Sequence, residues 1–177
     1  TEKGTLRLAA TAAPNSLNNL TTSEAANFDV LNNVFEGLTR MNIKGEIEPA
    51  VAESWTISDD KTVYTFKLRD TKWSNGEPVT AADFVFGWQK VLTLDTSSYK
   101  SLALLLKNGE AVTTETLDLS QFGVEAIDDH TLKMTLETPK PYILDVLSMI
   151  TFAPVNEAFY NEVTEDQYGT SKETILS

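Results

Sequence analysis

The sequence contains no cysteine and only one histidine. Without cysteine, disulfide bonds, thiol nucleophiles and zinc sites built from cysteine and histidine are all excluded. His130 has no second histidine or cysteine beside it with which to bind a metal or to complete a catalytic triad. We therefore expect no metal and no other cofactor.

Basic residues are few. The chain has 14 Lys and Arg against 26 Asp and Glu, which gives a net charge of -12. Such a charge repels the phosphate backbone of nucleic acids and the headgroups of anionic lipids. We expect no nucleic-acid partner.

Long hydrophobic runs are also missing, although 41% of the residues are hydrophobic and can form a buried core. No stretch approaches the about 18 consecutive apolar residues of a membrane helix. The first residues, Thr1–Gly4, lack the hydrophobic region of a signal peptide. We expect a globular chain from which any export signal or lipid anchor has been removed.

The common catalytic and nucleotide-binding motifs are absent. None of the eight glycines stands in G-x-G-x-x-G or G-x-x-x-x-G-K-[ST]. The G-x-S-x-G elbow of hydrolases and the H-E-x-x-H zinc motif do not occur either. The sequence thus gives no motif-based reason to expect an enzyme.

The N-terminal part is predicted to form a short strand and then a helix. Thr5–Ala10 alternates leucines with other residues, which is typical of a strand. Ser23 is predicted to cap a helix of about three turns that ends at Gly37. The apolar residues of this helix, spaced by three and four positions, are Phe28, Leu31 and Phe35.

Two segments of alternating apolar residues are predicted to form β-hairpins. The first surrounds the turn Asp59-Asp60-Lys61, and the second surrounds Asp128-Asp129-His130. Both turns continue as Asp-Asp-x-Thr, and we expect the two hairpins to belong to one sheet. Their apolar residues are Trp55, Ile57, Tyr64, Phe66, Leu68, Val124, Ala126, Leu132, Met134 and Leu136.

The most distinct helical pattern begins at Thr80, a predicted cap, with Asp83 near the positive end of the helix dipole. Its apolar face is formed by Phe84, Val85, Trp88, Val91 and Leu92. Further helices are predicted over residues 98–106, 142–147 and 156–161, and residues 171–177 are expected to begin another element. Hairpins and helices without repeated βαβ units indicate a mixed α/β or α+β fold.

The paired aspartates and His130 have an alternative interpretation as catalytic groups. Aspartate is a preferred turn residue, however, and adjacent carboxylates on a strand or loop point in different directions. Histidine tolerates the unusual backbone angles found at the tip of a turn. We interpret these residues as turn formers. Seven aromatic residues are interpreted as core residues rather than a stacking surface: Trp55, Tyr64, Phe66, Trp73, Phe84, Phe86 and Trp88.

Residues 47–92 read IEPAVAESWTISDDKTVYTFKLRDTKWSNGEPVTAADFVFGWQKVL. This stretch closely resembles the signature region of the bacterial extracellular solute-binding proteins of family 5, which include the peptide-binding receptors of ABC importers. Val34–Leu38 and Gly123–Leu132 resemble the oligopeptide-binding subgroup. One departure is Lys61, where relatives commonly have a glycine, the residue best suited to a left-handed backbone.

The resemblance implies a fold of the periplasmic-binding-protein type with two lobes, of which this chain contains only a part. Residues 1–44 are expected to supply the first strand and helix of lobe I. Residues 45–167 are expected to form a small extra domain with the hairpins and helices. Residues 168–177, after the segment Tyr168-Gly169, would begin the return to lobe I, and the opposite lobe would be missing.

The resemblance also implies a binding receptor without catalytic residues. An extended peptide would lie between the lobes, with its main chain paired to Ser23, Glu24 and Ala25 and with Tyr99 facing it. The lobes would close about a hinge around the peptide. The other expected partners are the membrane permease subunits of an ABC importer, and we expect a monomer, lipid-anchored at the cell surface or located in the periplasm.

Three alternatives stay open at this point. Relatives in the same family bind dipeptides, nickel complexes, haem, opines or oligosaccharides. Others take up peptide pheromones as signals. A secreted hydrolase acting on peptides or glycans, with Asp59, Asp60 and Asp128 as its carboxylates, would belong to a different class.

Overall fold

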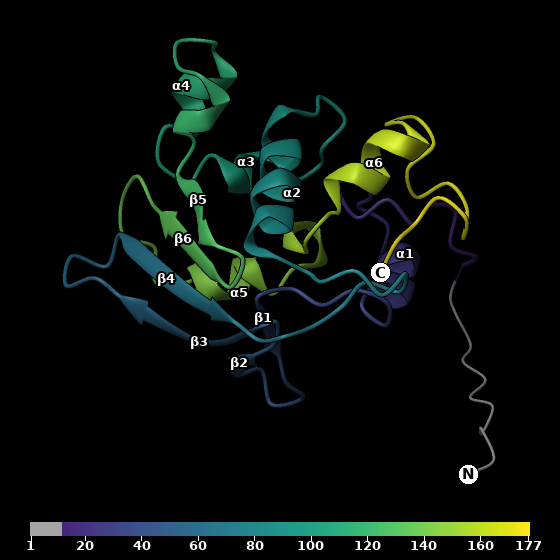
Figure 1. Ribbon diagram of the computed structural model, residues 1–177, viewed down its shortest axis with the longest axis horizontal. Helices are drawn as coiled ribbons and strands as arrows, with labels where there is room; N and C mark the ends of the chain where they lie inside the picture. The colour runs from purple at the N-terminus through teal and green to yellow at the C-terminus, as the bar shows by residue number, and fades with distance from the viewer. Residues whose placement is uncertain (1–11) are drawn as a thin grey trace.

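The structure, a computed structural model, describes residues 12–177 (Figure 1). The predicted strand Thr5–Ala10 lies outside the described residues. The largest sheet has four antiparallel strands in the order β3-β4-β6-β5. Its strands are β3 (Ala52–Ile57), β4 (Val63–Leu68), β5 (Val124–Asp128) and β6 (Thr131–Thr135). Both predicted hairpins are confirmed, and they share one sheet because β4 pairs with β6.

One face of the sheet is buried. Tyr64, Phe66 and Leu68 on β4 are buried, as are Leu132 and Met134 on β6. The predicted partners on β3 are less buried, because β3 lies at the edge of the sheet: Trp55 is partly buried and Ile57 is exposed. Alternation along the two central strands, β4 and β6, therefore separates a core face from a more exposed face.

The two hairpin turns are built by aspartate side chains. Asp60 accepts hydrogen bonds from the Ser58 hydroxyl at 2.5 Å and from the Thr62 amide at 3.1 Å. Asp128 accepts one from the His130 amide at 2.8 Å. Lys61 has φ of 58°, so this lysine occupies the left-handed conformation in which relatives were expected to have glycine.

The helix α2 (Ala81–Thr93) lies between the sheet and α6 (Glu157–Val163), as Figure 1 shows. Its predicted cap is confirmed, because Asp83 accepts hydrogen bonds from both the amide and the hydroxyl of Thr80 in a capping box. The buried side chains on α2 include Phe84, Trp88, Val91 and Leu92. Val85 is only partly buried but still packs against the core.

The helix predicted from Ser23 to Gly37 is much shorter in the structure. Helix α1 (Ala25–Leu31) has Glu24 at its N-cap position, so the prediction of Ser23 as the cap was wrong. The chain leaves the helix at Asn32 and Asn33, which form tight turns; asparagine competes for main-chain hydrogen bonds and ends helices readily.

Gly37 is therefore not a helix stop, and close packing explains why it is glycine. A Cβ atom at this position would lie 2.9 Å from the carbonyl oxygen of Leu147. Its own carbonyl accepts a hydrogen bond from the Val51 amide at 3.0 Å. The antiparallel strand pair β1 (Thr39–Met41) and β2 (Ile47–Pro49) follows directly in the sequence.

The helix predicted over residues 98–106 is reduced to the single turn α3 (Lys100–Ala103). The connection after it contains α4 (Gly109–Thr113) and the 3-10 turn η1 (Leu119–Gln121). The helices predicted near Tyr142 and Asn156 are confirmed as α5 (Ile143–Leu147) and as α6, with the turn η2 (Ile150–Phe152) between them. Residues 171–177 form turns rather than a helix or strand.

Segments from both ends of the described chain meet on one side of the molecule. The Leu17 amide donates a hydrogen bond to the Gly169 carbonyl at 2.7 Å, and the Tyr168 hydroxyl donates to the Asn19 side chain at 3.3 Å. Gly169 has φ of 72°, and a Cβ there would lie 2.3 Å from the Asn18 amide nitrogen. Only glycine fits this contact without displacing the main chain.

Candidate functional site

The predicted binding segment Ser23–Ala25 lies on the surface directly before and at the start of α1. All three residues are exposed. Glu24 has an extended backbone with φ of -84° and ψ of 129°. Among the hydrogen bonds between residues 12–177, none involves the main chain of Ser23. Ser23 therefore offers a main-chain donor and acceptor to an external partner, whereas the Glu24 amide donates to the Thr22 hydroxyl and its carbonyl accepts from the amides of Asn27 and Phe28.

A buried asparagine holds this segment in place. Asn27 on α1 donates hydrogen bonds to the Asn15 side chain at 2.9 Å and to the Thr22 hydroxyl at 2.7 Å. The side-chain oxygen of Asn27, Oδ1, accepts hydrogen bonds from the main-chain amides of Asn15 and Ser16 at 2.9 and 3.4 Å. The side chain is fully engaged and 1% exposed, so it fastens the chain before α1 to the helix itself.

Tyr99 lies beside the same helix. Its ring is 6.1 Å from that of Phe28 on α1, with an angle of 55° between the ring planes. The neighbouring Ser98 hydroxyl donates a hydrogen bond to the Thr21 carbonyl at 3.0 Å. The structure thus brings Tyr99 to the region of Ser23–Ala25, although more than seventy positions separate them in the sequence.

Asn27 and Phe28 contribute to this region and were not expected there. Phe28 was predicted only as one of the apolar residues at helical spacing, and it is partly buried against the core. The residue types alone do not distinguish a core phenylalanine from one that also contacts a surface tyrosine. No local pattern in the sequence marked Asn27.

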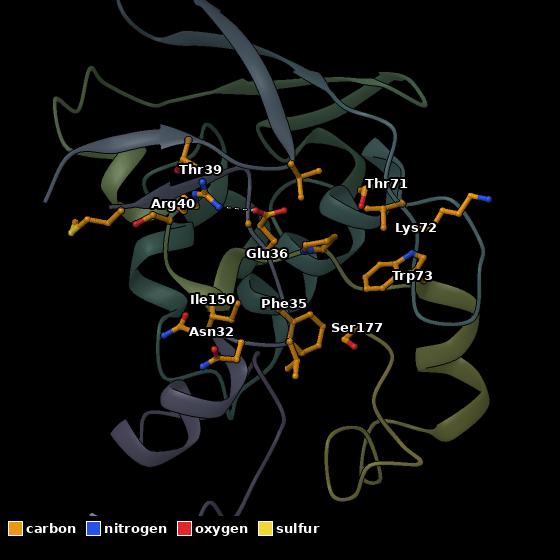
Figure 2. Close-up of a pocket in the computed structure, with 18 residues that line it drawn as sticks. Asn32, Phe35, Glu36, Thr39, Arg40, Thr71, Lys72, Trp73, Ile150 and Ser177 are labelled. Carbon is orange, nitrogen blue, oxygen red and sulfur yellow. Dashed lines mark ion pairs between the residues drawn. The ribbon is translucent and has the colours of Figure 1, made fainter. Parts of the chain in front are cut away.

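A cavity of about 660 Å³ opens at the other end of α1 (Figure 2). Asn32 and Phe35 line it from the helix side, Trp73 from the loop before α2, and Ile150 from η2. None of Ser23, Glu24, Ala25 or Tyr99 is among its lining residues. The predicted site and this cavity are separate features.

The wall of the cavity carries an ion-pair network centred on Glu36. This carboxylate pairs with Arg40 at 3.7 Å and with Arg69, which also donates a hydrogen bond to the Ala50 carbonyl at 2.9 Å. Arg40 pairs in turn with Glu48 at 2.6 Å. Because each of these arginines has a carboxylate partner, the network neutralises itself and leaves no excess charge for a ligand.

An aspartate of the first hairpin turn and an aspartate of the second lie too far apart to act together as a hydrolytic pair. The two turns lie at opposite ends of the sheet, since Val63 at the start of β4 faces Thr135 while Lys67 faces Thr131. The length of β4 separates them by roughly 17 Å, whereas carboxylates that cleave a glycosidic bond stand at most about 10 Å apart. The pKa of Asp60 is lowered by hydrogen bonds, above all the one from the Ser58 hydroxyl. The pKa of Asp128 is lowered in the same way, above all by the hydrogen bond from the His130 amide.

His130 is also engaged in a local contact, with its Nε2 atom 2.9 Å from a carboxylate oxygen of Asp70. Within residues 12–177, no group of three or more histidine or acidic side chains has an arrangement that could hold a metal ion. In the same part of the chain, no helix is long and apolar enough to cross a membrane.

Comparison with known proteins gives one matching family and several similar sequences. Residues 46–177 match the family model described as "Bacterial extracellular solute-binding proteins, family 5 Middle". The dipeptide-binding protein DppE of Bacillus subtilis is 43% identical over 129 residues, which is 72% of this chain and 24% of DppE. The oligopeptide-binding protein OppA of the same organism is 38% identical over 157 residues, which is 88% of this chain and 29% of OppA.

The fold agrees with that of a solved relative. Listeria monocytogenes OppA bound to peptide superposes with a TM-score of 0.89 and 36% identity, over 94% of this chain and 33% of that structure. The mixed helix-and-sheet fold expected from the sequence, of the periplasmic-binding-protein type, is confirmed. The chain spans about a quarter of the length of the curated relatives it matches. Tyr99 lies within the residues matched by the family model, and Ser23–Ala25 lie before them.

Proposed function

The chain belongs to family 5 of the bacterial extracellular solute-binding proteins, and from this premise we propose that it forms part of a receptor that captures extended oligopeptides for an ABC importer. The observation that carries the proposal is the exposed main chain of Ser23, which forms no hydrogen bond within residues 12–177. Tyr99 lies against Phe28 on the helix that begins directly after this segment. Relatives named for peptide binding, and one relative solved with peptide, support the proposal.

The proposed mechanism is main-chain pairing without chemistry. An extended peptide forms hydrogen bonds with the main chain of Ser23, Glu24 and Ala25, while Tyr99 contacts it from the side. Asn27 keeps the receptor segment in one conformation, which lowers the entropic cost of binding. A second lobe in the longer protein closes over the peptide, because the closed state gains contacts that the open state lacks.

We also propose the division into domains. Residues 1–44 and 168–177 belong to lobe I, and residues 45–167 form the small extra domain. The hydrogen bond from Leu17 to Gly169 supports this assignment, because it joins the two parts assigned to lobe I. The proposed boundary at residue 45 falls in the turn between β1 and β2, and the buried residues on its two sides form one hydrophobic cluster.

For the whole protein we propose permease subunits of an ABC importer as partners and a monomeric state. The family is one of extracellular binding proteins. Attachment by a lipid anchor at the cell surface is part of the proposal, with the periplasm as the alternative location.

A dipeptide is the second candidate ligand, because DppE is among the relatives with the higher identities. The two candidates differ in the length of main chain that pairs with the receptor. A dipeptide has too few backbone groups to pair with all three residues from Ser23 to Ala25 and also reach Tyr99.

The test is a nuclear magnetic resonance titration of the 15N-labelled chain with tetra-alanine. We expect weak binding, with a Kd on the order of 1 mM, because this chain supplies one wall of the cleft. The amide signals of Ser23, Glu24 and Ala25 should shift most, and mass spectrometry should recover the peptide intact.

The control ligand is tetra-alanine with N-methylated amides, which keeps the size of the peptide but cannot donate main-chain hydrogen bonds. It should bind at least about fivefold more weakly. Equal binding of the two peptides, shifts confined to other parts of the chain, or cleavage of the peptide would each contradict the proposed function.

A further inference from the structure

Phe28 and Tyr99 form an aromatic pair next to the proposed binding segment. The two rings come from α1 and from the residue before α3, and their centroids are 6.1 Å apart. Both side chains are only partly buried. Aromatic surface that stays partly exposed at the edge of a proposed binding segment is available for contact with a ligand.

The geometry of α1 brings this pair next to the proposed binding segment. The Phe28 amide donates a hydrogen bond to the Glu24 carbonyl at 3.2 Å, so Phe28 stands one turn after Glu24. In an α-helix the Cα–Cβ bond tilts toward the N-terminus. The Phe28 side chain therefore leans back over the turn that begins at Glu24 and Ala25.

The position of the pair is fixed from both sides. The Ser98 hydroxyl bonds to the Thr21 carbonyl at 3.0 Å, which ties the chain before Tyr99 to the chain before Ser23. Asn27, the neighbour of Phe28, bonds to Thr22 at 2.7 Å. A rigid aromatic pair discriminates between ligands better than a mobile one, because less entropy is lost when the ligand packs on it.

We propose that Phe28 and Tyr99 form a side-chain subsite that selects peptides with a large apolar residue, an aromatic one above all, where the peptide passes Ser23–Ala25. The inference rests on the proposed function. Successive side chains of an extended peptide point to opposite sides, so a peptide paired to Ser23–Ala25 directs alternate side chains toward this pair. Aromatic rings prefer tilted or offset contacts with other rings. The planes of the Phe28 and Tyr99 rings are inclined at 55° to each other, so a third ring can make such contacts with them.

The experiment measures binding of tetrapeptides to the 15N-labelled chain. One position of tetra-alanine is replaced by Phe, Leu or Glu, and the position is scanned along the peptide. At the best position we expect Phe to bind about tenfold more tightly than Ala, with Leu between them and Glu weaker than Ala. The signals of Phe28 and Tyr99 should shift with the Phe peptide and much less with tetra-alanine.

Variants separate the subsite from general effects. The preference for Phe over Ala should fall below about threefold in both Phe28→Ala and Tyr99→Ala, two changes on different elements. Tyr142→Ala, which removes an exposed aromatic ring elsewhere on the chain, should keep the full preference. Circular dichroism identifies any variant that does not fold, and the other variant then decides.

The outcomes distinguish the subsite from the proposed function. If peptides bind with shifts at Ser23–Ala25 but with equal affinity for Phe, Leu, Ala and Glu, the subsite is refuted and the proposed function stands. A preference that survives both Phe28→Ala and Tyr99→Ala also refutes the subsite. If no peptide shifts Ser23–Ala25, the proposed function fails and the subsite fails with it.

Discussion

Asn27 has the most demanding position among the polar residues of the proposed binding region. Its amide group is buried and makes four hydrogen bonds, to Asn15 at two atoms, to Ser16 and to Thr22. Burying a polar side chain costs little free energy when all of its donors and acceptors form hydrogen bonds. Removing that side chain leaves its several partner groups buried and unpaired. The conformation of Ser23–Ala25 depends on this one residue more than on any side chain of its own.

We predict that Asn27→Ala lowers the free energy of unfolding by about 2 to 4 kcal/mol. Asn27→Asp keeps the shape and the accepting oxygen but replaces the donating NH2 group with a second oxygen, and should lower the free energy of unfolding by a similar amount. Urea unfolding followed by circular dichroism measures the change. Asn33→Ala, at an exposed asparagine whose side chain donates a hydrogen bond to the Asp29 carbonyl, should change the free energy of unfolding by less than about 0.5 kcal/mol. Equal losses at positions 27 and 33 would disprove the special role of Asn27.

At the scale of single elements, the capping box of α2 contains a buried carboxylate. Asp83 is 8% exposed and accepts hydrogen bonds from Thr80 and from the Trp73 indole at 3.3 Å. Burial raises the pKa of Asp83 above 3.8, and the hydrogen bonds only partly oppose this shift. Ionised Asp83 therefore carries a net cost of burial, which its hydrogen bonds do not cancel.

The raised pKa has a definite sign in stability. Because the folded state holds this proton more tightly than the unfolded state, the contribution of Asp83 is fully present below pH 3.8 and is lost as pH rises through the folded-state pKa. Asp83→Asn removes the titration and keeps an accepting oxygen. The wild-type chain should thus lose stability relative to Asp83→Asn between about pH 3 and about pH 7.

Asp60→Asn provides a control of opposite sign. Hydrogen bonding, first from the Ser58 hydroxyl, lowers the pKa of Asp60, so its contribution is present above the unfolded pKa and is lost as pH falls. In urea unfolding measured over the same pH range, the wild-type chain should gain stability relative to Asp60→Asn as the pH rises. If both variants changed with pH in the same direction, our assignment of the two shifts would be wrong.

The sequence predicted elements well where local interactions determine them. The hairpins are local in sequence, and their turns are made by aspartates bonding to atoms two residues away. The cap of α2 is similarly local. Helix α1 was predicted too long because the apolar spacing continues to Phe35, whereas Phe35 reaches the core from the turns after the helix.

The site could be predicted only in part, because its geometry depends on distant contacts. The resemblance to a family suggested Ser23–Ala25 and Tyr99, but the sequence did not indicate that Phe28 and Tyr99 meet. That contact follows from the way the loop before α3 returns to α1, through the bond from Ser98 to Thr21. The assignment of the four residues to peptide binding stays a prediction.

At the scale of the whole molecule, Gly169 closes the contact between the two ends of the described chain. Its backbone is left-handed, and a Cβ would meet the Asn18 amide nitrogen at 2.3 Å. Neither the glycine conformation nor the main chain of Asn18 can change alone, since the Leu17 amide is bonded to the Gly169 carbonyl. A substitution here therefore strains the backbone and also separates two segments.

We predict that Gly169→Ala destabilises the fold by about 3 kcal/mol or more. The matched control is Gly76→Ala, at a glycine with φ of 93° and open space around it, where only the backbone penalty of about 1 kcal/mol applies. Thermal and urea unfolding of both variants measure the difference. Equal losses would mean that the contact with Asn18 adds nothing.

The hydrogen bond between Asn19 and Tyr168 can form only late in biosynthesis, after Tyr168 has been made. The two side chains are separated by 149 positions in the sequence. At ribosomal rates of about 5 to 20 residues per second, the early segment waits roughly 7 to 30 s before its partner is made. During that interval nascent residues around Asn19 lack this docking surface, so the proposed ligand-binding edge is among the last parts of the chain to mature.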